Sequence, residues 1–289
     1  MPRFFVSEDQ FSDDTVILTG EDAHHIARSL RMAAGEHITV CDPYSVEFDC
    51  ELISFEQDKR VVARVLSSKP SQSEPPYGAY LFQALPKGEK FDSIIQKAVE
   101  CGVHEIIPFQ SSRCIAKAKA DGEVEKTKRR CRIAAEAAKQ SGRGRLPKVV
   151  PTVSFKEMLR QASACDVCLF CYEGEGTESL ASILQSRQVK QLLAKTAWPK
   201  IAIVVGSEGG FSPEEAAEAK AAGMQMTGLG KRILRTETAA PFVLSCLVYG
   251  LEMLAFGRVS KKRPKNSPIF NKNMQNTIEK SQKRVYNIG

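Results

Sequence analysis

Hydrophobic and polar residues alternate along most of the first seventy residues. The stretches "TVILTG", "HITVCDP", "EFDCELISFE" and "RVVARVLSS" have a period of two residues, which is typical of half-buried strands separated by turns. A single helix, started by Asp22 or Glu21, is expected in "EDAHHIARSLRM". We predict a small β-barrel over residues 1–70, followed by a linker at residues 71–77 in the Ser- and Pro-rich stretch "SKPSQSEPPYG".

The pattern changes at Tyr77, where apolar runs begin to alternate with segments of helical period. The expected strands are "AYLFQALPK", "VHEIIPFQS", "DVCLFCYE" and "KIAIVVG". Helices are expected between them, including 121–140, 180–193 and 213–222. Strands that alternate with helices predict an α/β domain with a mostly parallel sheet covered on both faces, here over residues 78–257.

The longest apolar stretch runs from Thr238 to Phe256. Pro241, Gly250 and Glu252 interrupt it, so we do not interpret it as a membrane span. A helix that is apolar on nearly all sides is normally buried. We expect this one to lie partly in the core and partly against a second subunit.

The stretch "VVGSEGGFSPEE" joins an apolar run to the start of a helix. Ser212 as N-cap, Pro213 at the first helical position and Glu215 three residues after the N-cap predict a capping box. Glu208 and Glu214 disfavour a bound phosphate, and the stretch matches neither the P-loop nor the dinucleotide fingerprint. A small ligand with little negative charge, such as S-adenosylmethionine, fits this loop; a purely structural turn is the alternative.

Positive charge is concentrated in two blocks of the chain. Residues 113–148 contain twelve basic and four acidic residues, and residues 258–289 contain nine basic and one acidic residue, so each block carries +8 in a chain of net charge +7. Such blocks favour a polyanionic partner such as nucleic acid. The alternatives are a solvated helix face for the first block and a disordered tail for the second, and both are compatible with nucleic-acid binding.

The cysteines do not predict a metal centre or a disulfide framework. The chain has nine of them, scattered through apolar runs, which is typical of reduced thiols in the cytoplasm. Cys165, Cys168 and Cys171 have a spacing seen in iron–sulfur proteins, but the surrounding apolar residues favour a buried strand. The adjacent His24 and His25 diverge on a helix, so they cannot share one metal ion.

A second glycine-containing stretch, "LGKRILRTETAAPFVLSCL" at residues 229–247, adds a family resemblance. Together with "VGSEGGFSPEE" it resembles the C-terminal signature of the SPOUT superfamily, specifically the RsmE type that methylates N3 of a uridine in 16S ribosomal RNA. "MPRFFV", "HHIARSLRMAAGE", "QALPKGEKFDSIIQKAVECGV" and "EAAKQSGRGRLPKV" extend the resemblance over most of the chain. Ser207 replaces a common proline, Lys139 replaces a common acidic residue, and the basic tail at 258–289 extends past the usual end of the family.

The resemblance implies the architecture, the cofactor and the partners. It implies a PUA-like RNA-binding barrel at the N-terminus and a C-terminal α/β domain whose last third forms a deep trefoil knot. S-adenosyl-L-methionine would bind in the knot without a metal, and the protein would act in the cytoplasm as a homodimer on the 16S rRNA of the small ribosomal subunit. The implied cofactor-binding residues are Val205, Gly206, Glu208, Gly209, Gly210, Leu229, Gly230, Ile233 and Leu234.

The chemistry follows from uracil itself, because N3 carries a proton and is a weak nucleophile at neutral pH. A group that stabilises the developing anion would accelerate the reaction most. We assign this role to Arg235, and a possible role as proton acceptor to Glu237; an ion pair of Arg235 with Glu237 or Glu208 is the structural alternative. The expected contacts to RNA phosphates are Lys87, Lys97, Arg113, Arg143 and Arg232.

Two other functions stay open from the sequence. The chain could be an RNA-binding or ribosome-assembly protein that keeps the fold without catalysis, or a SPOUT 2′-O-ribose methyltransferase. The sequence also does not specify which nucleotide is modified, whether free RNA or the assembled subunit is the substrate, or what the tail does.

Overall fold

The structure, a computed structural model, describes residues 1–56, 59–116 and 122–254. The chain divides into two compact units. Of the described residues, the first unit comprises Met1–Glu74 together with Gly142–Leu146, and the second comprises Pro75–Ser141 and residues 147–254. The predicted tail at 258–289 lies outside the described residues.

The first unit is built on a six-stranded sheet with the order β1-β4-β5-β6-β3-β2. Only the pairing of β1 with β4 is parallel. The pairing of the two longest strands, β5 and β6, has two register shifts, and such irregularities bend a sheet. The terminal strands β1 and β2 are not paired with each other in the described sheet, so it corresponds to a curled sheet at the place of the predicted barrel. The strands are β1 (Arg3–Phe5), β2 (Phe11–Ser12), β3 (Thr15–Thr19), β4 (His37–Cys41), β5 (Val46–Glu56) and β6 (Arg60–Pro70).

One hydrophobic core holds this unit together. It is made by the inward side chains of the alternating strands, with fully buried Phe4, Leu18 and Phe48 among them. The predicted helix is present as a short α1 (Gly20–His24) that continues into a π-helical turn, η2 (His25–Ser29), and it buries Ala23 and Ile26 in the same core. A short 3₁₀ helix, η1 (Glu8–Gln10), completes the unit.

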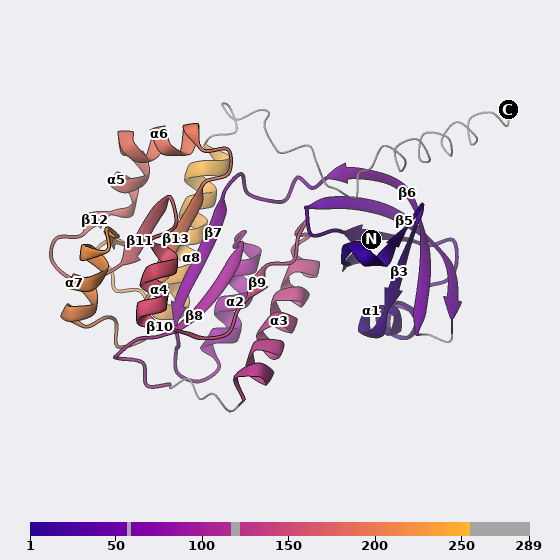
Figure 1. The fold of residues 1–289 in the computed structure, drawn as a ribbon, viewed down its shortest axis with the longest axis horizontal. Helices are drawn as coiled ribbons and strands as arrows, with labels where there is room; N and C mark the ends of the chain where they lie inside the picture. The colour runs from indigo at the N-terminus through magenta and orange to yellow at the C-terminus, as the bar shows by residue number, and fades with distance from the viewer. Residues whose placement is uncertain (57–58, 117–121, 255–289) are drawn as a thin grey trace. The chain divides into compact units, whose positions relative to one another are not determined.

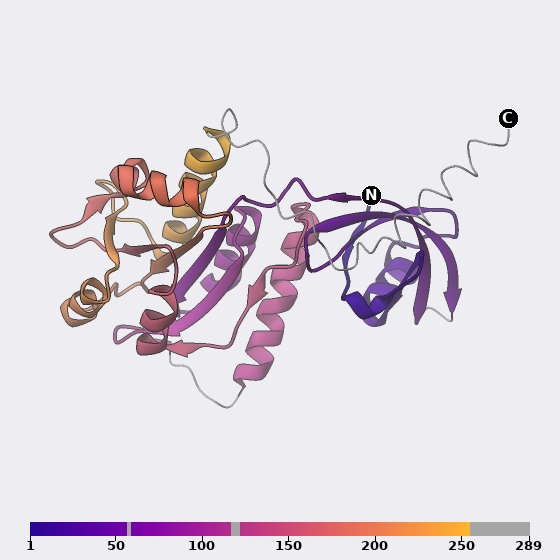
Figure 2. The ribbon, with the colours of Figure 1, turned by 45° about the horizontal axis from the view of Figure 1, so that its top comes forward.

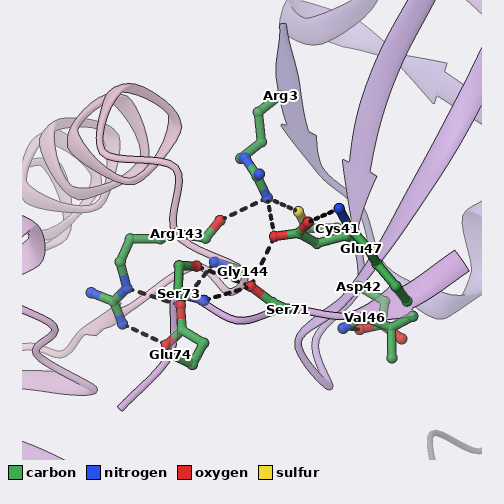
Figure 3. A network of polar contacts seen from close by, with 11 residues as sticks. Arg3, Cys41, Asp42, Val46, Glu47, Ser71, Ser73, Glu74, Arg143 and Gly144 are labelled. Atoms are coloured by element: carbon green, nitrogen blue, oxygen red, sulfur yellow. Dashed lines mark hydrogen bonds and ion pairs between the residues drawn. The ribbon is translucent and has the colours of Figure 1, made fainter. Parts of the chain in front are cut away.

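Residues 142–146 join the first unit through a polar network (Figure 3). The Arg143 guanidinium donates to both carboxylate oxygens of Glu74, at 2.9 and 2.8 Å, and the Gly144 N–H donates to Glu74 Oε1 at 2.8 Å. Arg3 donates to the Arg143 carbonyl at 3.2 Å and to Glu47 at 3.0 Å. A Cβ on residue 144 would lie 2.1 Å from the Oγ of Ser71, so only glycine fits there.

The second unit has an eight-stranded sheet in which every pairing is parallel (Figure 1). The order is β10-β8-β7-β13-β11-β14-β12, with β9 paired to β8. This confirms the predicted α/β class. The strands are β7 (Gly78–Ala84), β8 (Glu105–Gln110), β9 (Lys148–Val149), β10 (Val153–Ser154), β11 (Val167–Cys171), β12 (Glu178–Ser179), β13 (Lys200–Val205) and β14 (Gln225–Gly228).

Helices cover both faces of this sheet. On one face α4 and α7 pack on Phe82, Phe170 and Val204. On the other face α2 packs between α3 and α8, and α3 is the long magenta helix of Figure 2. The helices are α2 (Lys90–Glu100), α3 (Glu123–Gln140), α4 (Phe155–Ala162), α5 (Leu180–Gln185), α6 (Arg187–Lys195), α7 (Pro213–Ala221) and α8 (Thr236–Leu247), which continues into a π-helical segment, η3 (Val248–Met253).

The structure tests the predicted helix over 180–193 and the predicted strand around Cys168 and Cys171. The single helix predicted over 180–193 is wrong, because Ser186 has an extended backbone and its side chain caps the N–H of Val189, which starts α6 separately from α5. The strand predicted around Cys168 and Cys171 is confirmed as β11. No described helix is long and apolar enough to cross a membrane.

Candidate functional site at the carboxyl edge of the parallel sheet

The loops singled out in the sequence lie at one edge of the parallel sheet. Parallel strands end at the same edge, and ligands of open α/β sheets bind there. Loop 85–89 follows β7, loop 206–212 follows β13 and loop 229–235 follows β14. The chain then enters α8, which packs back on β13 and β7. Segments far apart in sequence are thereby brought to one place.

Loop 206–210 is a tight turn whose glycines are required by packing and backbone conformation. Gly210 donates its N–H to the Ser207 carbonyl at 2.9 Å and has a left-handed φ of 63°. A Cβ on Gly206 would lie 3.2 Å from the Gly210 Cα, and a Cβ on Gly209 would lie 3.0 Å from the Arg113 Cβ. At Gly206 and Gly209, protein atoms already occupy the space that a Cβ would need.

The predicted capping box at the start of α7 is present. Ser212 Oγ accepts the Glu215 N–H at 3.2 Å, and Glu215 Oε2 accepts the Ser212 N–H at 3.0 Å. Glu215 is buried, and its other oxygen accepts the Ser112 N–H at 2.7 Å. The Arg113 side chain donates to the Gly209 carbonyl at 3.1 Å. The helix start is therefore satisfied by the protein's own carboxylate, and the 111–113 segment is fixed against the glycine loop.

Lys90, which sequence reasoning did not select, bridges two predicted site residues. Its Nζ lies 2.9 Å from Glu208 Oε1 and 3.4 Å from Glu237 Oε2. Both Glu208 oxygens also accept the Lys87 N–H at 3.2 Å. Burial raises the pKa of Glu208, but the hydrogen bonds from Lys90 and from backbone N–H groups outweigh it and lower the pKa overall. The hydrogen bond to Glu208 raises the pKa of Lys90 in turn.

A buried amide lies beneath the same loops, at the end of β7. Gln83 is fully buried, and its Nε2 donates to Thr236 Oγ1 at 2.9 Å and to the Ala84 carbonyl at 3.0 Å. Thr236 Oγ1 donates to the Gly206 carbonyl at 2.6 Å, so it can only accept from Gln83, which fixes the orientation of the amide. Gln83 Oε1 is buried with no hydrogen-bond partner among the described residues.

Loop 229–235 carries the candidate catalytic arginine. Arg235 is the N-cap residue of α8; it is exposed, and its side chain makes no hydrogen bond or ion pair within the part of the chain that the structure describes. The ion pair of Arg235 with Glu237 or Glu208, the alternative considered above, is not formed among the described residues. Both carboxylates contact Lys90 instead. In the same loop Leu229 and Leu234 are half-buried, Gly230 has a left-handed φ of 107°, and Ile233 is 83% exposed.

Four of the five basic residues expected to contact RNA are exposed, and one is buried. Lys87, Lys97, Arg113 and Arg232 are exposed in the second unit. Arg143 belongs to the first unit, and its side chain is only 3% exposed in the ion pair with Glu74. The expectation that Arg143 contacts an RNA phosphate is therefore corrected. Its guanidinium is engaged inside the protein and cannot also bind a phosphate.

The described residues contain no group of three or more His, Cys, Asp and Glu side chains that could hold a metal ion. Cys168 and Cys171 lie in β11, and Cys165 precedes that strand. Burial raises the pKa of Cys165 and of Cys171 to about 12, so both stay protonated thiols at neutral pH.

Comparison with known proteins identifies the family. A family model described as an RNA methyltransferase domain matches residues 73–248, and a model described as an RNA methyltransferase PUA domain matches residues 18–66. The chain belongs to this RNA methyltransferase family. The first match covers most of the second unit and the second match lies within the first unit, which confirms the expected PUA domain and methyltransferase domain in these parts of the chain.

Named relatives within the family cover nearly the whole chain. The ribosomal RNA small subunit methyltransferase E of Bacillus subtilis is 35% identical over 257 residues, covering 88% of this chain and 98% of the relative. The enzyme of the same name from Mesomycoplasma hyopneumoniae is 34% identical, covering 85% and 98%. A solved structure of the Neisseria gonorrhoeae enzyme, bound to S-adenosyl methionine, is 30% identical with a TM-score of 0.73 and covers 86% of this chain and 97% of that chain.

The residues that sequence reasoning missed are Lys90, Gln83 and Thr236. Gln83 had a detectable signal, since it is a polar residue within the apolar run "YLFQAL". Lys90 had none, because one lysine at the start of an amphipathic helix is ordinary. Its two contacts come from residues more than a hundred positions away.

Proposed function

We propose that this protein transfers a methyl group from S-adenosyl-L-methionine to N3 of a uridine in the 16S rRNA of the small ribosomal subunit. Two things support the proposal: membership of the RNA methyltransferase family over both units, and an exposed Arg235 at the loop edge of the parallel sheet that has no partner among the described residues. The observation that carries most weight is the placement of Arg235 at the meeting point of the loops after β7, β13 and β14.

The loop edge fits a nucleoside cofactor of low negative charge. Gln83 Oε1 is a buried acceptor that receives no hydrogen bond from the described residues, and Glu208 and Glu237 add carboxylates that would repel a phosphate. When bound, the cofactor supplies a methyl group on a sulfonium. The residues we propose to hold it, largely through backbone groups, are Val205, Gly206, Glu208, Gly209, Gly210, Leu229, Gly230, Ile233 and Leu234.

We assign the chemical role chiefly to Arg235. Loss of the N3 proton leaves negative charge on the uracil oxygens, and a planar guanidinium fixed nearby stabilises that anion. Glu237 is the candidate proton acceptor. Its Oε2 lies 3.4 Å from the Lys90 Nζ. In this proposal, stabilisation of the anion by Arg235 is the larger contribution.

RNA binding is assigned to both units. In the second unit the exposed Lys87, Lys97, Arg113 and Arg232 are proposed to contact phosphates, which fix the position of the RNA without reading its sequence. The first unit is proposed to add further contacts, as the description of its PUA model implies.

We further propose a homodimer, a trefoil knot and a cytoplasmic location. Phe242, Tyr249 and Met253 are exposed at helical spacing on α8 and η3, and an exposed apolar face of this kind suits a subunit interface. The knot is supported by the strand order, since β11 lies between β13 and β14, while α8 returns from β14 to pack on β13 and β7. Nine free cysteines suit a reducing cytoplasm.

Methyl transfer from the labelled cofactor to purified small-subunit RNA tests the proposal. We expect incorporation with the wild-type protein and loss of turnover in Arg235→Lys with little change in affinity for cofactor and RNA. A protein that binds RNA but neither binds the cofactor in calorimetry nor incorporates label would be a non-catalytic assembly factor. Running free RNA and assembled subunits in parallel identifies the preferred substrate.

A further inference from the structure

Lys90 contacts two carboxylates of the candidate site, and one of them, Glu237, lies two residues after the proposed catalytic Arg235. We propose that Lys90 is a positioning residue that holds Glu208 and Glu237 away from Arg235 and so keeps the Arg235 guanidinium available for the uracil. The inference rests on the proposed role of Arg235, and the experiment below separates failure of the one from failure of the other.

The first argument is the contact geometry. The Lys90 Nζ lies 2.9 Å from Glu208 Oε1 and 3.4 Å from Glu237 Oε2, so one ammonium group serves two carboxylates. Glu237 Oε2 is buried and has no hydrogen-bond partner among the described residues, which leaves the Lys90 charge as its compensation. Without Lys90, two carboxylates would remain close together with no cation between them.

The second argument is the position of Arg235. It precedes the first turn of α8, two residues before Glu237, and its side chain is exposed without a partner in the described structure. If Glu237 lost its cation, the long Arg235 side chain two residues away would be drawn to it, and to Glu208 on the other side of Lys90, because opposite charges at close range attract strongly. The observed arrangement avoids that pair by supplying a different cation.

The third argument is that Lys90 is well placed to do this. It is the first residue of α2, and the helix is anchored directly behind it by buried Phe91 and Ile94. Its side chain reaches the glycine loop through Glu208 and the start of α8 through Glu237. Lys90 therefore acts on Arg235 through the carboxylates and is not itself expected to touch the substrate.

The test begins with Lys90→Met in the full-length protein, assayed with S-adenosylmethionine and small-subunit RNA. Capture of Arg235 by the freed carboxylates should lower kcat by on the order of a hundredfold, the effect of losing one preorganised anion-stabilising donor. The KM for the cofactor should change little. Lys90→Arg should keep most of the rate, because it restores a cation between the carboxylates. Lys220→Met removes an exposed lysine on α7 and serves as the matched control.

A double-mutant cycle then isolates the mechanism. In a Glu208→Gln/Glu237→Gln background no carboxylate is left to capture Arg235, so Lys90→Met should cost at most about a tenth of the factor that it costs in the wild type. The triple variant should therefore be faster than Lys90→Met alone. A purely structural clamp predicts that the triple variant is as slow as Lys90→Met, since further loss of contacts would not restore the rate.

The outcomes are distinguishable. If Arg235→Met keeps the wild-type rate, the proposed role of Arg235 fails. If Arg235→Met loses activity but Lys90→Met does not, the role of Lys90 is overturned and that of Arg235 stands. The inference is equally overturned if Lys90→Met raises the cofactor KM at unchanged kcat, or if its effect is the same in the Gln background.

Discussion

The buried ion pair of Arg143 and Glu74 allows a test of whether Arg143, a residue predicted to bind RNA, stabilises the fold instead. Glu74 accepts two hydrogen bonds from Arg143 and one from Gly144. The Arg143 side chain is 3% exposed and the Glu74 side chain 11%. Glu74→Gln keeps the shape but removes the charge. It removes the negative charge that faces the buried Arg143 guanidinium and should cost about 3 kcal/mol, the lower end for breaking a buried pair.

The assay is urea unfolding of the full-length protein. With a slope of about 2 kcal/mol per molar urea, a loss of about 3 kcal/mol moves the midpoint down by about 1.5 M. Hydrogen exchange of the β4 and β5 amides assigns the loss to the first unit. The control is Glu157→Gln, because the pair of Glu157 with Arg160 is exposed and i,i+3 within α4, and its midpoint should hardly move.

The same variants separate a structural role from RNA binding. Arg143→Met should be destabilised like Glu74→Gln and, at temperatures where it is folded, bind RNA with an unchanged slope of log affinity against log salt. The reasoning would be refuted by normal stability of Glu74→Gln together with a slope lowered by roughly 0.7–0.9 in Arg143→Met, the signature of one lost phosphate contact.

Three further predictions concern the second unit. Gly209→Ala places a Cβ 3.0 Å from the Arg113 Cβ, and this overpacking should weaken cofactor binding about tenfold in calorimetry; unchanged affinity would remove this loop from the site. Arg235→Lys should lower turnover about a hundredfold and be partly rescued at high pH, where solution deprotonates uracil; lost RNA affinity at an unchanged single-turnover rate would make Arg235 a positioning residue. Burial raises the pKa of Glu123, but hydrogen bonds from Thr152 and the charge of Arg130 outweigh it and lower the pKa below its ordinary value of 4.5. The contribution of Glu123 to the free energy of unfolding should therefore be fully present above pH 4.5 and be lost as the pH falls through the lowered pKa. Acid unfolding of the wild type should show this loss, and Glu123→Gln should not.

Local pattern was sufficient for much of the second unit. The capping box of Ser212 and Glu215 and the apolar run of β13 depend on neighbours in sequence, and both are present as predicted. The break between α5 and α6 was not predicted, because the local sequence does not distinguish Ser186 from a serine inside a helix. In the structure its side chain caps the first turn of α6.

Long-range electrostatic partners were beyond the sequence. Arg143 looks like an RNA ligand within a basic segment, and only the fold brings Glu74, 69 positions away, against its guanidinium. Likewise, Arg235 beside Glu237 suggests an ion pair, and only the fold brings Lys90 between Glu237 and Glu208. The charge pattern of the sequence identifies candidate functional residues. Ion pairs with residues far away in sequence determine which of these side chains are available to bind a ligand.

The central claim is methylation of a uracil base by the site at the carboxyl edge of the parallel sheet. Its most direct test is mass spectrometry of nucleosides from small-subunit RNA, digested before and after incubation with the protein and methyl-labelled S-adenosylmethionine. The account predicts label in 3-methyluridine, in RNA that alkali still cleaves at that nucleotide. Label on the ribose, with the base unmodified and the backbone resistant to alkali, would contradict it.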